Sequence, residues 1–367
     1  MKEKLSILLT DTVRLYLRCN KRMKEFGSDF HYIDTYNSGR AHLTNVFNGA
    51  TLLADGRQCI VVLIRQYGWK RIWIPDYFCY EVIDTIKEQT GIKVMFYEDT
   101  PLQEGEVENL PFKEGDVLLR MNFFGLRDKR SNKNIPCPVI EDHTHDPFGH
   151  WALYSNADWC ISSIRKILPL PEGGMMWSPK GNSLTSDLQP SEENEQIAAT
   201  RWEGMEMKTA YLKGENVSKE EFRKRYTETE EFFDRAEPAE IDNRSRKLVS
   251  KQLDINLWQG AKRKNWMLLK SLVNQDSCTV MIPEDESCTA FSLTLLMKSK
   301  AQRNALRKRL IEACVYPAIL WVVPDSASEN SKDFSERMLS IHCDGRYTEE
   351  DVRQLAGILN KEIEEIR

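Results

Sequence analysis

Short apolar runs alternate with helical or loop segments from about residue 54 onward, and this alternation constrains the fold more than any other feature of the chain. Such an alternation predicts a mostly parallel sheet of the α/β class. The near-continuous apolarity of the runs indicates that both faces of the sheet are covered. The runs are RIWIP (71–75), VMFYE (94–98), DVLLRMNFFG (116–125), PVIED (138–142), DWCISS (158–163) and GGMMWS (173–178).

A second pattern of the same kind closes the chain and predicts a smaller α/β unit. Between the two patterns, long charged segments predict helices at 218–236 and 262–273. We expect two domains: an N-terminal segment with the large domain over 1–245, and a small C-terminal domain over 246–367. Further expected elements are a helix over 1–24, apolar segments at 291–297, 316–324 and 338–344, helices over 301–313 and 348–366, and an exposed loop at 325–333.

Composition and charge exclude several classes of partner. The 367 residues include 51 Lys and Arg against 56 Asp and Glu, a net charge of −5, which gives no footprint for nucleic acid or anionic lipid. No apolar run reaches the ~18 residues of a membrane span, and the first residues do not form a secretory signal. Nine scattered cysteines without a CxxC pair are typical of reduced thiols. We therefore expect a cytoplasmic protein.

Two polar features follow strands of the predicted sheet. Glu141 and Asp142 end one strand, at the edge where open α/β sheets bind ligands. A carboxylate there can pair with the protonated nitrogen of a heteroaromatic cofactor, or it can cap a helix or form an internal ion pair. Lys166 comes just after the next strand, and a lysine in a partly desolvated pocket can form a Schiff base with an aldehyde. A surface lysine is the plain alternative.

Two further features are weaker when taken alone. Gly56 lies in DGRQ (55–58) at the start of an apolar helix, where backbone amides can approach an anion, although such turns are common. Histidines and acids cluster between Asp142 and His150, and imidazole with carboxylate suits a metal ion. No HExxH or similar spacing is present, so we favour a loop in which one histidine contacts a ligand over a metal site.

The order of these features resembles the fold-type I family of pyridoxal-phosphate enzymes. Within it, the chain looks like the DegT/DnrJ/StrS aminotransferases, which include the sugar-nucleotide aminotransferases. The resemblance extends from about residue 50 to the end. It is carried by DGRQ (55–58), IPDYFC (74–79), NFFGLRD (122–128), VIEDHTHD (139–146), SSIRKILPLPEGG (162–174), YPAILW (316–321) and IHCDGRYTEEDV (341–352).

The resemblance implies a role for each matched residue. Lys166 would hold pyridoxal 5'-phosphate as a Schiff base and move the proton, Asp142 would pair with the pyridine nitrogen, and His145 would lie against the ring. The other implied cofactor-binding residues are Gly56, Arg57, Gln58, Ser162 and Ser163 around the phosphate, and Tyr77 or Tyr80 on a face of the ring. The implied fold is a mostly parallel central sheet with helices on both faces and a smaller C-terminal α/β domain, assembled as a homodimer.

The implied activity is transfer of an amino group from an amino-acid donor to a keto or aldehyde acceptor, for which a keto-sugar is one candidate. Two positions depart from the family pattern: Ile161 stands where its serine is expected, and Cys79 where its stacking aromatic is expected. Both departures weaken the implied nucleotide-sugar substrate more than they weaken the implied cofactor. The alternatives that stay open are other reactions of the same cofactor (decarboxylation, elimination or C–C bond chemistry), a non-catalytic homologue, and a metallohydrolase built on His143, His145 and His150.

Overall fold

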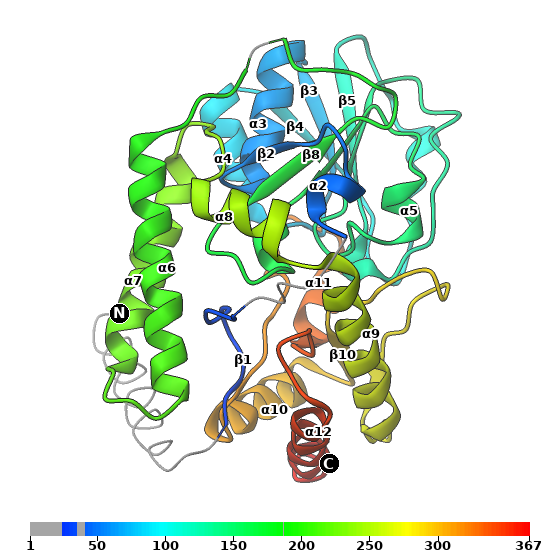
Figure 1. The fold of residues 1–367 in the computed structure, drawn as a ribbon. Coiled ribbons are helices and arrows are strands. Elements are labelled where there is room, and N and C mark those ends of the chain that lie inside the picture. The colour runs from blue at the N-terminus through cyan, green and yellow to red at the C-terminus, as the bar shows by residue number, and fades with distance from the viewer. Residues whose placement is uncertain (1–23, 35–40, 186) are drawn as a thin grey trace, which may run out of the picture.

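The computed structural model describes residues 24–34, 41–185 and 187–367. The helix expected over 1–24 lies outside these residues, apart from its last position. Figure 1 shows a large sheet in the upper half of the molecule, a smaller α/β unit below it, and two long helices alongside. No described helix is both long enough and apolar enough to cross a membrane.

The large sheet has seven strands in the order β2-β8-β7-β6-β5-β3-β4. Strands β3 to β7 pair in parallel, whereas β8 runs antiparallel to both β7 and β2. The predicted mostly parallel α/β sheet is therefore confirmed. The strands are β2 (Thr51–Leu53), β3 (Arg71–Pro75), β4 (Lys93–Tyr97), β5 (Asp116–Met121), β6 (Val139–Asp142), β7 (Trp159–Ser162) and β8 (Gly174–Trp177).

Both faces of this sheet bury apolar side chains, which explains the continuous apolarity of its strands. On β3, Ile72 and Ile74 join the main core, whereas Trp73 between them packs with Leu118 in a second cluster on the opposite face. Successive side chains of a strand point to opposite faces, so a strand covered on both sides favours consecutive apolar residues, as in Ile72, Trp73 and Ile74.

Two helices of this domain begin and end where local chemistry dictates. Asp55 accepts a hydrogen bond from the Arg57 amide and caps α3 (Gly56–Tyr67). Helix α3 and α4 (Tyr80–Thr90) both end at a glycine in the left-handed conformation, where a side chain would be strained. The short segments of the domain are α2 (Leu43–Val46), α5 (His150–Leu153), η1 (Val107–Asn109), η2 (Phe123–Gly125) and η3 (Ile164–Lys166).

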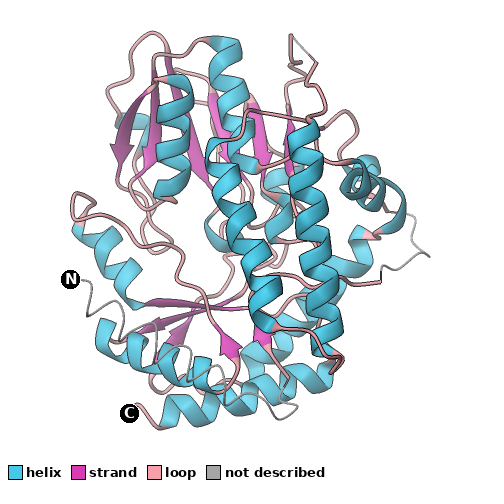
Figure 2. Cartoon of the chain, turned by 90° about the vertical axis from the view of Figure 1, so that its left-hand side faces the viewer, coloured by secondary structure: helices cyan, strands magenta, loops and turns pink. Residues whose placement is uncertain are grey.

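Helices α6 (Glu192–Leu212) and α7 (Lys219–Arg235) form a hairpin that extends past both sheets (Figure 2). The chain then passes through α8 (Asn243–Lys247), η4 (Leu248–Gln252) and α9 (Ile255–Leu272) into the small unit. Its sheet has the order β12-β10-β9, and β1 pairs with β11 beside it. The elements are β1 (Phe26–Gly27), β9 (Cys278–Val280), β10 (Leu293–Met297), α10 (Lys300–Glu312), β11 (Val315–Tyr316), α11 (Glu329–Arg337), β12 (Met338–Ile341) and α12 (Glu349–Glu364).

Three expectations about the small unit meet different outcomes. Thr348 caps α12 in a reciprocal pair with Asp351, as its position before three acids predicts. The apolar segment 316–324 is a strand only at its first residue, because most of it crosses between the two units as a loop. The loop expected at 325–333 is wrong in its second half, where Ser328 caps α11.

The described cysteines differ in whether their thiols are free. Seven have free thiols: Cys59, Cys79, Cys137, Cys160, Cys278, Cys288 and Cys343. Cys314 is in a disulfide, so the expectation that every cysteine is reduced is wrong at this position.

Candidate functional site

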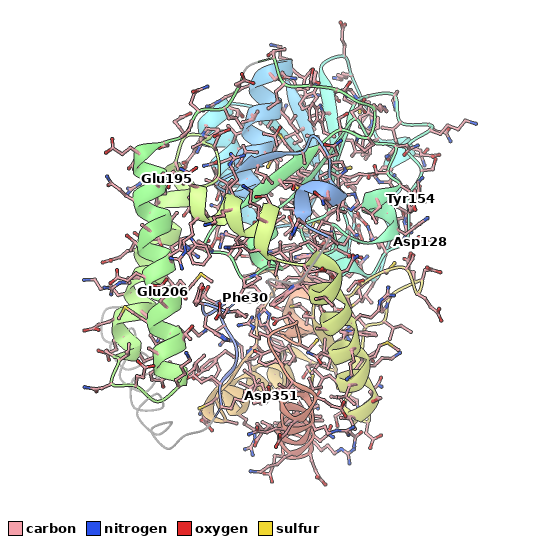
Figure 3. All side chains as sticks on the ribbon, viewed as in Figure 1. Phe30, Asp128, Tyr154, Glu195, Glu206 and Asp351 are labelled. Atoms are coloured by element: carbon pink, nitrogen blue, oxygen red, sulfur yellow. The ribbon has the colours of Figure 1, made fainter. Side chains whose placement is uncertain are left out.

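A cavity of about 280 Å³ lies where the large sheet, the α6–α7 hairpin and the small unit meet. The large domain contributes His145 and Lys166 to its wall, and α6 contributes Arg201. Phe30, from the segment after β1, closes another side and lies between the hairpin and the body of the molecule (Figure 3). Every major part of the fold therefore reaches this cavity.

Strands β6 and β7 bring Asp142 and Lys166 to the same edge of the sheet. Asp142 is the last residue of β6 and is paired in parallel with Ile161, while Lys166 ends the short turn η3 that follows β7. Burial raises the pKa of the Asp142 carboxyl, and the hydrogen bond from the Thr144 amide (2.8 Å) and the positive charge of Lys166 offset part of this effect. The acid and the amine thus interact electrostatically in a buried environment.

His145 presents a neutral imidazole to the cavity. Its Nδ1 accepts a hydrogen bond from the Phe124 amide at 3.0 Å, which leaves the proton of the neutral ring on Nε2. Burial, followed by the charge of Lys166, lowers the pKa of His145 well below its usual value. The ring lies parallel to that of Trp321, 24° apart with centroids separated by 5.6 Å, so an aromatic wall fixes its orientation.

Gly56, Ser162 and Ser163 form a polar corner at the N-terminus of α3. A Cβ atom at Gly56 would lie 2.6 Å from the Cβ of Ser163, so only glycine allows this close approach. The hydroxyls of Ser162 and Ser163 are buried and have no hydrogen-bond partner among the residues that the structure describes. Buried hydroxyls without partners are costly, and an anion held at a helix N-terminus would supply acceptors to them. This corner therefore fits a phosphate group.

Arg57 and Gln58 do not turn toward the cavity. The Arg57 guanidinium pairs with Asp234 and lies 3.7 Å from Asp55. The Gln58 side chain bonds the backbone on both sides of a turn, donating to the Glu237 carbonyl and accepting from the Ala239 amide, both at 3.3 Å. Both side chains hold the end of α7 against α3. Because the Arg57 amide already donates to Asp55, a phosphate contact from this pair of residues would have to come from the Gln58 amide.

Of the predicted site residues, only His145 and Lys166 line the cavity itself, and the side chains of Tyr77 and Tyr80 have other partners. Tyr77 is fully buried, donates its hydroxyl to the Leu320 carbonyl and packs edge-on against Phe334. Tyr80 stacks on Phe96 of β4, away from the cavity. The aromatic rings beside His145 are instead those of Phe291, Phe124 and Trp321, with centroids 4.6, 5.2 and 5.6 Å from that of the imidazole. Phe291 and Trp321 come from distant segments of the chain, so no local sequence pattern predicts their contacts with His145.

The three histidines proposed as metal ligands are bound to different partners. His143 Nε2 bonds Glu141 at 3.1 Å, whereas exposed His150 lies 3.4 Å from Asp128 and His145 bonds the backbone. Among the described residues, the one group with metal-like donor spacing is Glu141, His143 and Cys160, with donor atoms within 4.8 Å of one another. Glu141 also accepts from Ser155 at 2.5 Å and Asn132 at 2.6 Å, so hydrogen bonds already occupy this carboxylate.

Known proteins resemble this chain in structure and not in sequence. No protein-family model and no curated protein matches the sequence. Among solved structures, Helicobacter pylori PseC, an aminotransferase involved in the biosynthesis of pseudoaminic acid, has a TM-score of 0.60 at 11% identity, over 93% of this chain and 100% of that one.

Two further aminotransferase structures are similar over most of their length. S. venezuelae DesV, in complex with a ketimine intermediate, gives a TM-score of 0.54 at 12% identity and covers 99% of this chain and 97% of its own. The aminotransferase TlmJ from Streptoalloteichus hindustanus gives 0.54 at 13% identity, with 86% of each chain covered. The fold is therefore that of the fold-type I aminotransferases of the DegT/DnrJ/EryC1/StrS type.

Proposed function

We propose that this chain is a pyridoxal-phosphate-dependent aminotransferase, which transfers an amino group from an amino-acid donor to a keto or aldehyde acceptor. The observation that carries the proposal is that Lys166 and His145 line one cavity, while buried Asp142, at the end of β6, interacts electrostatically with Lys166. Two buried serine hydroxyls without a partner among the described residues precede Lys166 in the chain. The solved aminotransferases with this fold favour a keto-sugar as the acceptor. The proposal includes a homodimer and a cytoplasmic location, as expected from the sequence.

The cofactor supplies an aromatic ring that accepts the electron pair left when a proton leaves the carbon bearing the amino group. Lys166 would bind the cofactor and then carry that proton with its freed amine. Asp142, oriented by Thr144, would keep a proton on the ring nitrogen. The neutral imidazole of His145 would pack on the ring without adding a charge. Trp321, behind it, would keep that side of the site apolar.

The phosphate would bind at the corner formed by Gly56, Ser162 and Ser163. There the N-terminus of α3 packs against Ser163, and the two serine hydroxyls are donors that lack a partner among the described residues. The division of the chain into residues 1–245 and 246–367 belongs to the same proposal, because the cavity lies between the sheets of these two parts.

Visible absorbance on addition of pyridoxal phosphate tests the cofactor. We expect the wild-type protein to turn yellow, Lys166→Ala to stay colourless, and Lys180→Ala, which changes an exposed lysine paired with Asp158, to behave as wild type. Addition of glutamate alone should then release 2-oxoglutarate and bleach the yellow form. A colourless wild-type protein contradicts the proposal, and a yellow protein that releases CO₂ or ammonia instead points to another reaction of the same cofactor.

A further inference from the structure

Two arginines lie side by side on the wall of the cavity that contains Lys166. Arg165, in η3, and Arg201, on α6, both place their guanidinium groups over the ring of Phe233, at 5.2 and 5.3 Å from its centroid. Both also bond Glu230 of α7, Arg165 at 2.6 Å and Arg201 at 3.1 Å. The shared carboxylate and the shared ring hold the two cations together despite their like charge.

Each arginine keeps an unused donor. Arg165 donates through Nη2 to Glu230 and Asp55, and Arg201 donates through Nε and Nη1 to residues 171, 226, 229 and 230. Within the described part of the chain, Nη1 of Arg165 and Nη2 of Arg201 have no hydrogen-bond partner, and Nε of Arg165 is buried without one. The pair therefore has N–H groups for an acceptor that the described chain does not supply.

The charges around the cavity leave this pair incompletely neutralised. Burial acts to raise the pKa of Glu230, but the two arginines outweigh it and lower that pKa to about 2, so one ionised carboxylate serves two guanidinium groups. Asp55, the second acid near Arg165, is shared with Arg57. Another cation on the wall, Arg346, is already bound by both oxygens of Asp344 and by backbone carbonyls.

We propose that Arg165 and Arg201 form an anion subsite that binds a carboxylate group of the substrate beside Lys166. This inference rests on the proposed function, which makes Lys166 the reacting amine. Planar guanidinium groups match a carboxylate in shape and bind it with charge-assisted hydrogen bonds. The cofactor phosphate has its own donors at Ser162 and Ser163, and a cavity of about 280 Å³ favours a compact acid over a nucleotide.

Asp29 provides a way to test this subsite without disturbing it. It is the one acid among the described residues of the cavity wall, its side chain is exposed, and no hydrogen bond to its carboxylate is present. It interacts electrostatically with both Arg165 and Arg201. An incoming carboxylate would therefore be repelled by Asp29, and Asp29→Asn should bind it more tightly while folding normally.

Isothermal titration of the protein in the presence of saturating pyridoxal phosphate measures this directly, with glutarate as the probe and uncharged glutaramide as its control. We expect glutarate to bind the wild-type protein and glutaramide not to, and we expect Asp29→Asn to strengthen glutarate binding about three- to tenfold. Asp84→Asn, at an exposed position on α4, should leave binding unchanged. Arg201→Gln and Arg165→Gln should each weaken binding about tenfold or more.

Inorganic phosphate, titrated into protein without the cofactor, separates the substrate from the cofactor as the source of the anion. Phosphate binding that falls with Arg165→Gln and Arg201→Gln, together with glutarate binding that does not, would assign the arginines to the cofactor and overturn the inference. Equal glutarate affinities for wild type and Asp29→Asn would overturn it as well. Because the titration measures heat and not colour, a protein that binds glutarate but stays colourless disproves the cofactor assignment alone.

Discussion

Glu141 and Asp142 are neighbours on one strand, are both buried, and have opposite environments. Glu141 accepts hydrogen bonds from His143, Ser155 and Asn132, and these outweigh the effect of burial and lower its pKa. Asp142 accepts only from Thr144 among the described residues, and burial raises its pKa. A carboxylate whose partners are all in the chain stabilises the fold, whereas one that lacks them is available to a ligand.

The largest loss of activity is expected from a change at Lys166, which interacts electrostatically with Asp142. Lys166→Arg keeps the positive charge but removes the amine that can bind an aldehyde, so we expect activity to fall by more than about 10³-fold. The free energy of unfolding should change by less than about 0.5 kcal/mol, because Lys166 is only partly buried and has no hydrogen-bond partner among the described residues. Steady-state kinetics and urea unfolding check the two halves; residual activity within tenfold of wild type would contradict the assigned role.

Changing the two neighbouring acids separates the ligand-binding carboxylate from the structural one. Asp142→Asn should lower activity about 100-fold or more with a small change in stability, because it removes a charge directed at the ring nitrogen. Glu141→Gln should do the reverse: little change in activity per folded molecule, with unfolding easier by about 1–3 kcal/mol, because an amide replaces an acceptor in a buried network. Equal losses of activity at the two positions would show that the contrast has no functional meaning.

As it does at Asp142, burial raises the pKa of Asp146, and this makes the stability of the fold depend on pH. Burial raises the pKa of this carboxyl from 3.8 to about 6, despite a hydrogen bond from the Thr289 amide at 2.8 Å. Between pH 4 and 6 the folded protein therefore holds a proton that the unfolded chain has released, so this group lowers stability by about 2–3 kcal/mol as pH rises through that window. Asp146→Asn stays neutral and should lack this loss. Parallel unfolding curves from pH 4 to 7 for both proteins would contradict the prediction.

The smallest expected effect comes from removing one hydrogen-bond donor of Glu141, the Ser155 hydroxyl. Its hydroxyl donates to Glu141 at 2.5 Å and accepts from the Ala157 amide at 3.0 Å. Ser155→Ala should cost about 1–2 kcal/mol of stability, because the buried carboxylate loses one of its donors, and should leave activity unchanged. Thermal unfolding monitored by circular dichroism measures the cost. A matched loss of activity at temperatures where the variant is folded would place Ser155 in the functional site.

Local patterns predicted much of this fold because strands and helix ends depend on neighbouring residues. The strands β3 to β8 and the glycines after α3 and α4 follow from apolar runs and from conformations that only glycine adopts easily. Lys166, Asp142 and His145 could be expected at one sheet edge because parallel strands end together. Their roles remain proposals, because sheet position does not fix chemistry.

The missed features all depend on contacts between distant segments. Trp321 contacts His145 only because the segment after β11 crosses between the two units as a loop. The apolar residues of this segment are equally typical of a strand, so the sequence does not predict the contact. The pairing of Arg165 with Arg201 depends on a helix hairpin packing against the turn after β7. Tyr80 stacks on Phe96 because α4 lies against β4, a contact that no local pattern specifies.

The most direct measurement is to fix the cofactor in place chemically and find the residue that carries it. The protein is incubated with pyridoxal phosphate, reduced with borohydride, digested, and read by mass spectrometry. A stable adduct on the peptide that contains Lys166, absent from Lys166→Ala, is the predicted result. An adduct spread over exposed lysines, or none at all, would contradict the assignment of this cavity as a cofactor site.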